Sequence, residues 1–195
     1  MTDILDEIIA HKRLEIEQQK ATISQELLIN NCNEPMPRRS MRASLSASPS
    51  GIIAEFKRRS PSKGWIKENA QADIISPAYE MAGASVLSIL TDENFFGGNL
   101  KDIRAARPQV SLPILRKDFI IDEYQLYQAR VMGADAVLLI AACLTPEQCL
   151  MFAKLAHTLN MEVLLEIHSE EELDHLNPFV DMLGVNNRNL GTFHT

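Results

Sequence analysis

Short apolar runs alternate with longer amphipathic stretches from Gly51 onward, and this alternation limits the possible folds more than any other feature of the sequence. The runs are rich in Val, Ile and Leu, and each intervening stretch is long enough to hold a helix. They lie at residues 52–56, 85–90, 113–117, 135–141, 162–167 and 182–187. Strands that are almost continuously apolar are typical of a sheet covered on both faces. The pattern therefore predicts six strands in repeated parallel strand–helix units.

Successive runs begin 20 to 33 residues apart. This spacing suits either a doubly wound α/β sheet or a (β/α)₈ barrel, also called a TIM barrel. No Gly-x-Gly-x-x-Gly and no Gly-x-x-x-x-Gly-Lys-Ser/Thr follows any run, so the best evidence for a nucleotide-binding open sheet is missing. The sequence favours the barrel.

The first 50 residues follow a different pattern. Apolar residues at helical spacing predict a helix over residues 1–20, and a second short helix is expected near 24–31. Residues 34–51 are rich in Pro and Ser, and they form either a solvated linker or a segment packed on the main domain. We therefore divide the chain into an N-terminal helical extension, residues 1–50, and a barrel portion with strands 1–6, residues 51–195.

Composition excludes several classes of protein. Hydrophobic residues make up 46% and charged residues 23%, which argues against disorder. The formal charge of −7 argues against a nucleic-acid partner. No apolar run approaches the roughly 18–20 residues of a membrane span, and three cysteines without Cys-x-x-Cys suggest neither a disulfide framework nor a zinc site. We expect a cytoplasmic protein with no membrane partner and no metal.

Ionisable and amide side chains gather at the carboxyl ends of four of the six runs. Residues two apart share one face of a strand, and the carboxyl ends of barrel strands converge on one mouth, where such enzymes place their chemistry. The side chains are Glu55 and Lys57, Lys117, Glu166, and Asn186 with Arg188. They either form structural ion pairs, for instance Glu55 with Lys117, or perform general acid–base chemistry on a carbonyl compound.

Basic residues also crowd the loop after the first run. Lys57, Arg58, Arg59 and Lys63 lie within seven positions of an acidic protein. Together with Lys117 and Arg188 they favour an anionic small-molecule substrate, although a solvated loop would have the same composition.

Several of these segments resemble one known family. Residues 55–64 are EFKRRSPSKG, residues 90–98 are LTDENFFGG, residues 115–120 are LRKDFI, and Glu166 is followed by VNNRNL at 185–190. In order and spacing they are similar to the indole-3-glycerol-phosphate synthases of tryptophan biosynthesis. The resemblance covers the whole chain, including the helical N-terminal extension.

This resemblance implies a (β/α)₈ barrel and a carboxy-lyase that needs no cofactor. Its phosphosugar substrate, 1-(2-carboxyphenylamino)-1-deoxyribulose 5-phosphate, undergoes ring closure, loss of carbon dioxide and loss of water. By the same resemblance, Lys117 is the general acid of ring closure, and Glu166 stabilises the developing cation and takes part in proton transfer. Glu55 and Lys57 serve as base and acid of the dehydration. The expected substrate-binding residues are Ser60, Asn186 and Arg188.

Chain length qualifies this expectation. A typical barrel takes about 250 residues, so two strand–helix units and the phosphate-binding loops after strands seven and eight would be absent from these 195 residues. We expect a sheet with open edges to be unstable alone, to self-associate, or to be a piece of a longer product. The alternative function is a catalytically incomplete fragment that needs a partner chain or acts as a binding module. The isomerase of the preceding step is disfavoured. Its reaction is usually drawn with a Cys–Asp acid–base pair, and no cysteine here ends a strand at the mouth.

Overall fold

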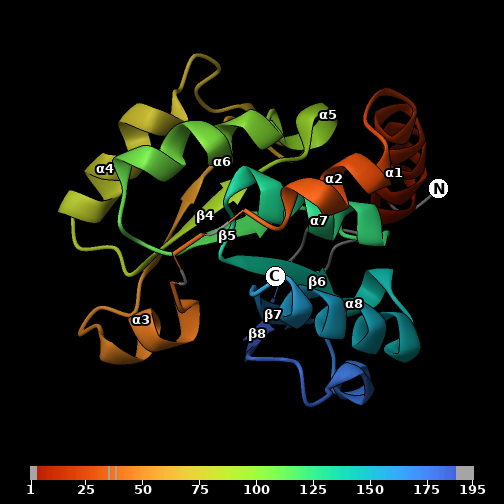
Figure 1. The fold of residues 1–195 in the computed structure, drawn as a ribbon. Coiled ribbons are helices and arrows are strands. Elements are labelled where there is room, and N and C mark those ends of the chain that lie inside the picture. Colours follow the sequence, from red (N-terminus) through yellow and green to blue (C-terminus); the bar gives the residue numbers. More distant parts are fainter. Residues whose placement is uncertain (1–3, 35, 38, 188–195) are drawn as a thin grey trace.

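The strands form one parallel sheet in the computed structural model, which describes residues 4–34, 36–37 and 39–187. The strands are β1 (Ile53–Phe56), β4 (Val86–Leu90), β5 (Ile114–Lys117), β6 (Ala136–Ile140), β7 (Glu162–Ile167) and β8 (Met182–Val185). Their order across the sheet follows the chain, and each neighbouring pair is parallel. All six predicted strands are confirmed. The sheet curls as in the predicted barrel, and it does not close among the described residues (Figure 1).

Helices follow the strands on the outer face of the sheet (Figure 1). They are α4 (Ala72–Met81), α5 (Glu93–Phe96), α6 (Leu100–Ala106), α7 (Glu123–Met132) and α8 (Pro146–Thr158), with 3₁₀ turns at Arg107–Gln109, Ala141–Cys143 and Glu171–His175. Thr145 caps α8, because its hydroxyl accepts from the Gln148 amide and Pro146 occupies the first turn. A small antiparallel hairpin after β1 was not predicted. It is formed by β2 (Arg59–Ser60) and β3 (Gly64–Trp65).

The two faces of the sheet pack against different partners. Alternate strand residues such as Leu87, Val137 and Val163 point outward and pack with α6, α7 and α8 in the larger core. The residues between them, such as Leu115 and Leu138, point inward and form the barrel interior. This alternation is the strand period of two, and it places Lys117 and Glu166 on the inward face.

Two of the three N-terminal helices pack against opposite ends of that interior, and the second helix along the chain lies against α7 (Figure 1). Of these, α1 (Ile4–Thr22) and α2 (Gln25–Asn31) confirm the two predicted helices, and α3 (Met41–Ala47) follows. Ile8 of α1 packs among the inward-facing residues, and so does Met41 of α3, which is fully buried. The Glu162 carboxylate at the start of β7 accepts from the Ser40 hydroxyl and the Arg42 amide. Residues 40–47 are therefore a packed segment, which is one of the two interpretations the sequence left open.

The outer strands β1 and β8 each pair on one side only within the described residues. Side chains on them are exposed, with Val185 at 69% and Leu183 at 44%. Self-association through these edges stays a prediction. In the described part of the chain, no helix is both long and apolar enough to cross a membrane.

The turn after β4 depends on Gly98. A Cβ built at this position would lie 2.2 Å from the carbonyl oxygen of Leu90 and 3.0 Å from that of Asp92. Because both neighbours are backbone atoms, Gly98→Ala has to displace the turn, and we expect a loss of about 1–3 kcal/mol in the free energy of unfolding. Urea denaturation measures it. Gly184→Ala is the matched control, since its nearest neighbour is a leucine methyl at an ordinary 3.4 Å. Equal losses in both variants would refute the explanation.

Candidate active site

Lysine and glutamate meet at the carboxyl ends of β5 and β7. The Lys117 Nζ lies 3.9 Å from Oε2 of Glu166, and both side chains are partly buried. The Asn186 side-chain amide, just after β8, donates to Oε1 of Glu166 at 3.1 Å. In the sheet, Glu166 pairs with Ile140 of β6 on one side and with Gly184 of β8 on the other. An ammonium, a carboxylate and an amide thus converge at the barrel mouth.

A second pair lies at the end of β1. The Lys57 ammonium donates to Oε1 of Glu55 at 2.6 Å. No hydrogen bond or ion pair links either residue to Lys117 or Glu166 within the described part of the chain. The structural ion pair considered from sequence, Glu55 with Lys117, is therefore not the one formed.

Ser60, another expected binding residue, makes no hydrogen bond to either pair among the described residues. Ser60 is buried in the hairpin, where its hydroxyl accepts from the Lys63 amide at 3.2 Å. Arg188 lies outside the described residues.

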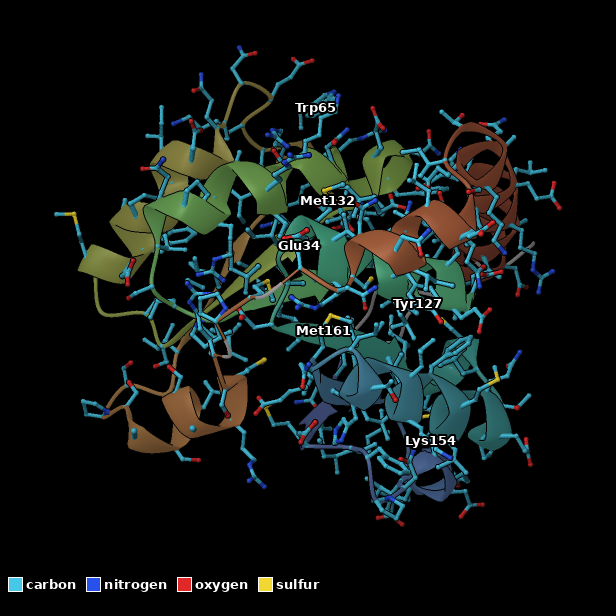
Figure 2. The ribbon with its side chains drawn as sticks, viewed as in Figure 1. Glu34, Trp65, Tyr127, Met132, Lys154 and Met161 are labelled. Atoms are coloured by element: carbon cyan, nitrogen blue, oxygen red, sulfur yellow. The ribbon has the colours of Figure 1, made fainter. Side chains whose placement is uncertain are left out.

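The basic loop after β1 is partly neutralised. The Arg58 guanidinium makes two bonds to the Asp102 carboxylate, at 2.6 and 2.7 Å, and it also donates to the Gly97 carbonyl. The Arg59 guanidinium lies 5.7 Å from the ring of Trp65, which projects outward from the hairpin (Figure 2). Arg58 therefore links the loop to α6 through its ion pair with Asp102. The unpaired positive charge near the mouth is smaller than the sequence suggested.

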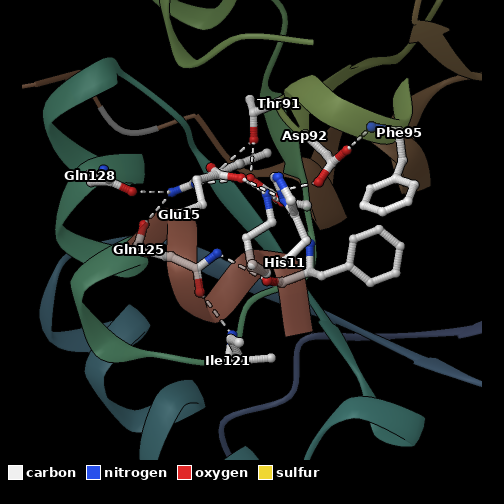
Figure 3. Close-up of polar contacts among 12 residues, drawn as sticks. His11, Glu15, Thr91, Asp92, Phe95, Ile121, Gln125 and Gln128 are labelled. Atoms are coloured by element: carbon white, nitrogen blue, oxygen red, sulfur yellow. Dashed lines mark hydrogen bonds and ion pairs between the residues drawn. The ribbon is translucent and has the colours of Figure 1, made fainter. Parts of the chain in front are cut away.

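A buried ionic cluster surrounds Asp118, the residue after Lys117, and Figure 3 shows its polar contacts. The carboxylate of Asp118 accepts hydrogen bonds from the Arg116 guanidinium at 2.9 Å and from the Thr91 hydroxyl at 2.6 Å, and it forms an ion pair with Lys12 of α1 at 3.1 Å. Burial alone raises the pKa of Asp118, but the two cations and the Thr91 hydroxyl outweigh it and hold that pKa well below its usual range. Burial lowers the pKa of Lys12, but the carboxylates of Asp118, Asp92 and Glu15 outweigh it and hold that pKa above its usual value.

This lowered pKa predicts acid sensitivity. Because the unfolded chain binds a proton to Asp118 more readily, the stabilisation is present above about pH 4 and is lost as pH falls through the lower folded value. Asp118→Asn is expected to be less stable than the wild type at pH 7, with the difference shrinking below pH 4. Urea denaturation at several pH values measures the free energy of unfolding of both proteins. The test uses the difference between them, because burial raises the pKa of Asp135, and this gives the wild type an opposite dependence of stability on pH. A difference independent of pH would contradict the assignment.

Sequence reasoning missed Lys12. Its position was available, because Lys12 lies four residues after Ile8 and four before Ile16, both buried on the same stripe of α1. A lysine on the apolar stripe of a helix signals a buried ion pair, since an unpaired charge there is too costly. Asp118 directly follows Lys117 in the sequence, but nothing local indicated that Lys12, 106 residues earlier, supplies its partner.

Helices packed outside a curled parallel sheet, with charged groups at its carboxyl edge, define the class of (β/α)-barrel enzymes. A solved structure of a mandelate oxidase shares this fold, with a TM-score of 0.50 at 15% sequence identity, over 75% of this chain and 52% of that one.

Sequence comparison identifies the family. The profile described as indole-3-glycerol phosphate synthase matches residues 5–195. The indole-3-glycerol phosphate synthase of Bacteroides thetaiotaomicron is 65% identical over 195 residues, covering 100% of this chain and 75% of that protein. That of Neisseria meningitidis serogroup B is 50% identical over 198 residues, covering 99% of this chain and 76% of that protein. The chain belongs to the indole-3-glycerol phosphate synthase family, and it spans about three quarters of the length of these relatives.

Proposed function

We propose that this chain catalyses the reaction for which its family is named, in the cytoplasm, as a step of tryptophan biosynthesis. The substrate is 1-(2-carboxyphenylamino)-1-deoxyribulose 5-phosphate, and the products are indole-3-glycerol phosphate, carbon dioxide and water. One observation carries the proposal: the Lys117 ammonium faces the Glu166 carboxylate at the carboxyl edge of the sheet. A proton donor beside an anion is the arrangement that this reaction needs.

Ring closure uses that pair. The ring carbon that bears the carboxylate attacks the ketone carbon, and the Lys117 ammonium donates a proton to the ketone oxygen as it gains charge. The ring becomes cationic, and the Glu166 carboxylate stabilises that charge. Carbon dioxide then leaves without its bonding electrons, which restore the aromatic ring.

Dehydration uses the pair on β1. The Glu55 carboxylate removes a proton from the methylene carbon beside the nitrogen, and Lys57 protonates the departing hydroxyl as water. Their 2.6 Å contact supports a shared role, because a proton can pass between the two groups between steps. Ser60, Asn186 and Arg188 bind and orient the substrate, and Asn186 also fixes the Glu166 carboxylate through its hydrogen bond.

A labelled substrate tests the reaction class. The chain is incubated with substrate carrying carbon-13 in its carboxylate, and both the gas phase and the products are analysed by mass spectrometry. The proposal predicts one labelled carbon dioxide for each indole-3-glycerol phosphate formed. An isomerase would keep the label in the sugar-linked product, and a binding module would leave the substrate unchanged. Either result would overturn the proposal.

A further inference from the structure

Lys12 is the one lysine of the described residues whose side chain is fully enclosed, and it belongs to α1 rather than to the barrel. Its Nζ lies 2.8 Å from Glu15, 2.9 Å from Asp92 and 3.1 Å from Asp118. Glu15 is on the same helix, whereas Asp92 lies two residues after the end of β4 and Asp118 directly follows β5. The ammonium therefore ties one helix to the carboxyl ends of two neighbouring strands (Figure 3).

The charges in this cluster require Lys12. Three carboxylates share two cations, Lys12 and Arg116. Asp92 also caps α5 through the Phe95 amide, which occupies its other oxygen. Removal of Lys12 would leave three carboxylates with Arg116 alone, and Arg116 contacts only Asp118 among them. Repulsion would then push α1 and the two strand ends apart.

Asp118 makes this cluster relevant to chemistry. It directly follows Lys117, and its Oδ1 accepts from the Phe119 amide at 2.8 Å, so the carboxylate fixes the turn that leaves β5. The Lys117 ammonium makes no side-chain hydrogen bond among the described residues, since its contact with Glu166 is 3.9 Å. The position of its ammonium thus depends on the backbone that Asp118 anchors.

We propose that Lys12 is a positioning residue for ring closure: by bridging Asp92 and Asp118 it seats α1 on the strand ends and holds the Lys117–Asp118 turn, and so the Lys117 ammonium, in the orientation that the reaction needs. The inference rests on the proposed function. Lys12 touches no substrate, and its effect reaches the reaction only through Asp118 and the turn.

Kinetics of three variants test the inference. In Lys12→Met, which keeps the length of the side chain without its charge, we expect kcat to fall about 10- to 100-fold, because misplacement of a catalytic group by about 1 Å costs on that order. KM should change less than about threefold. Lys12→Arg restores the charge and should recover part of kcat. Lys20→Met is the matched control, since Lys20 is on the same helix and pairs with Asp122 at 2.7 Å on the surface. Its kcat should equal that of the wild type.

Hydrogen exchange provides a readout that needs no turnover. In Lys12→Met, the amides of residues 117–121 and those of α1 should exchange faster than in the wild type. In Lys20→Met, the amides of both segments should exchange at the wild-type rate. If Lys12→Met does not fold, Lys12→Gln, which keeps a neutral donor, replaces it in both measurements. Unchanged kcat, or loss of protection confined to α1, would overturn the inference. A wild type that forms no indole product contradicts the proposed function instead, and protection of residues 117–121 then decides the role of Lys12.

Discussion

Replacement of Lys117 by alanine is expected to reduce kcat for indole formation by about 10²–10⁴-fold, which is the usual contribution of one oriented acid. Without the ammonium, the ketone oxygen has no proton donor as negative charge develops on it. The Lys117 side chain makes no hydrogen bond among the described residues and one 3.9 Å ion pair, so the fold should persist. We expect the free energy of unfolding to change by less than about 1 kcal/mol.

Indole fluorescence measures the rate, and urea denaturation measures the stability. Lys154→Ala is the matched control, because Lys154 is an exposed lysine on the outer face of α8 (Figure 2). It should leave both quantities unchanged. A Lys117→Ala variant that forms indole at the wild-type rate would remove Lys117 from the mechanism.

Arg116→Met is expected to cost about 3–5 kcal/mol in the free energy of unfolding, as is usual when one partner of a buried ion pair is removed. The Arg116 side chain is almost fully buried, and it bonds Asp118, the Thr91 hydroxyl and the Gln125 carbonyl. Methionine fills similar space but donates no hydrogen bond, so part of the Asp118 charge loses its partner.

Urea denaturation of this variant is compared with that of Arg104→Met. Arg104 is exposed on α6, and its removal should change the free energy by no more than about 0.5 kcal/mol. A loss below about 1 kcal/mol for Arg116→Met would mean that the cluster does not hold the strand ends together.

The fold was predictable because its strands and helices have strong local signals. Every predicted strand begins within one residue of its position in the structure, since buried parallel strands are nearly continuous in apolar residues. The start of α8 was predictable from Thr145 and Pro146, because an N-cap and a proline in the first turn are local signals. The alternation of side chains then placed Lys117 and Glu166 on one face, and parallel order brought them to one mouth.

The hairpin and the ionic cluster were not predictable in this way. Arg59 and Ser60 form a strand of two residues, which is too short for any periodic signal. Arg58 was counted as a basic group for the substrate, but its partner Asp102 lies 44 residues away on α6. The partners of Lys12 are likewise set by how α1 crosses the strand ends. Pairings over such distances depend on tertiary packing, which a single sequence does not display.

The central claim is that Lys117 and Glu166 act as one unit at the carboxyl edge of the sheet. A double-mutant cycle tests it most directly, with kcat measured by indole fluorescence for Lys117→Ala, Glu166→Gln and the variant that carries both. Groups that act in the same step are not additive. We therefore predict that the double variant is no slower than the slower of the two single variants. A double variant whose loss equals the product of the two single losses would show that the residues act independently, and would contradict the claim.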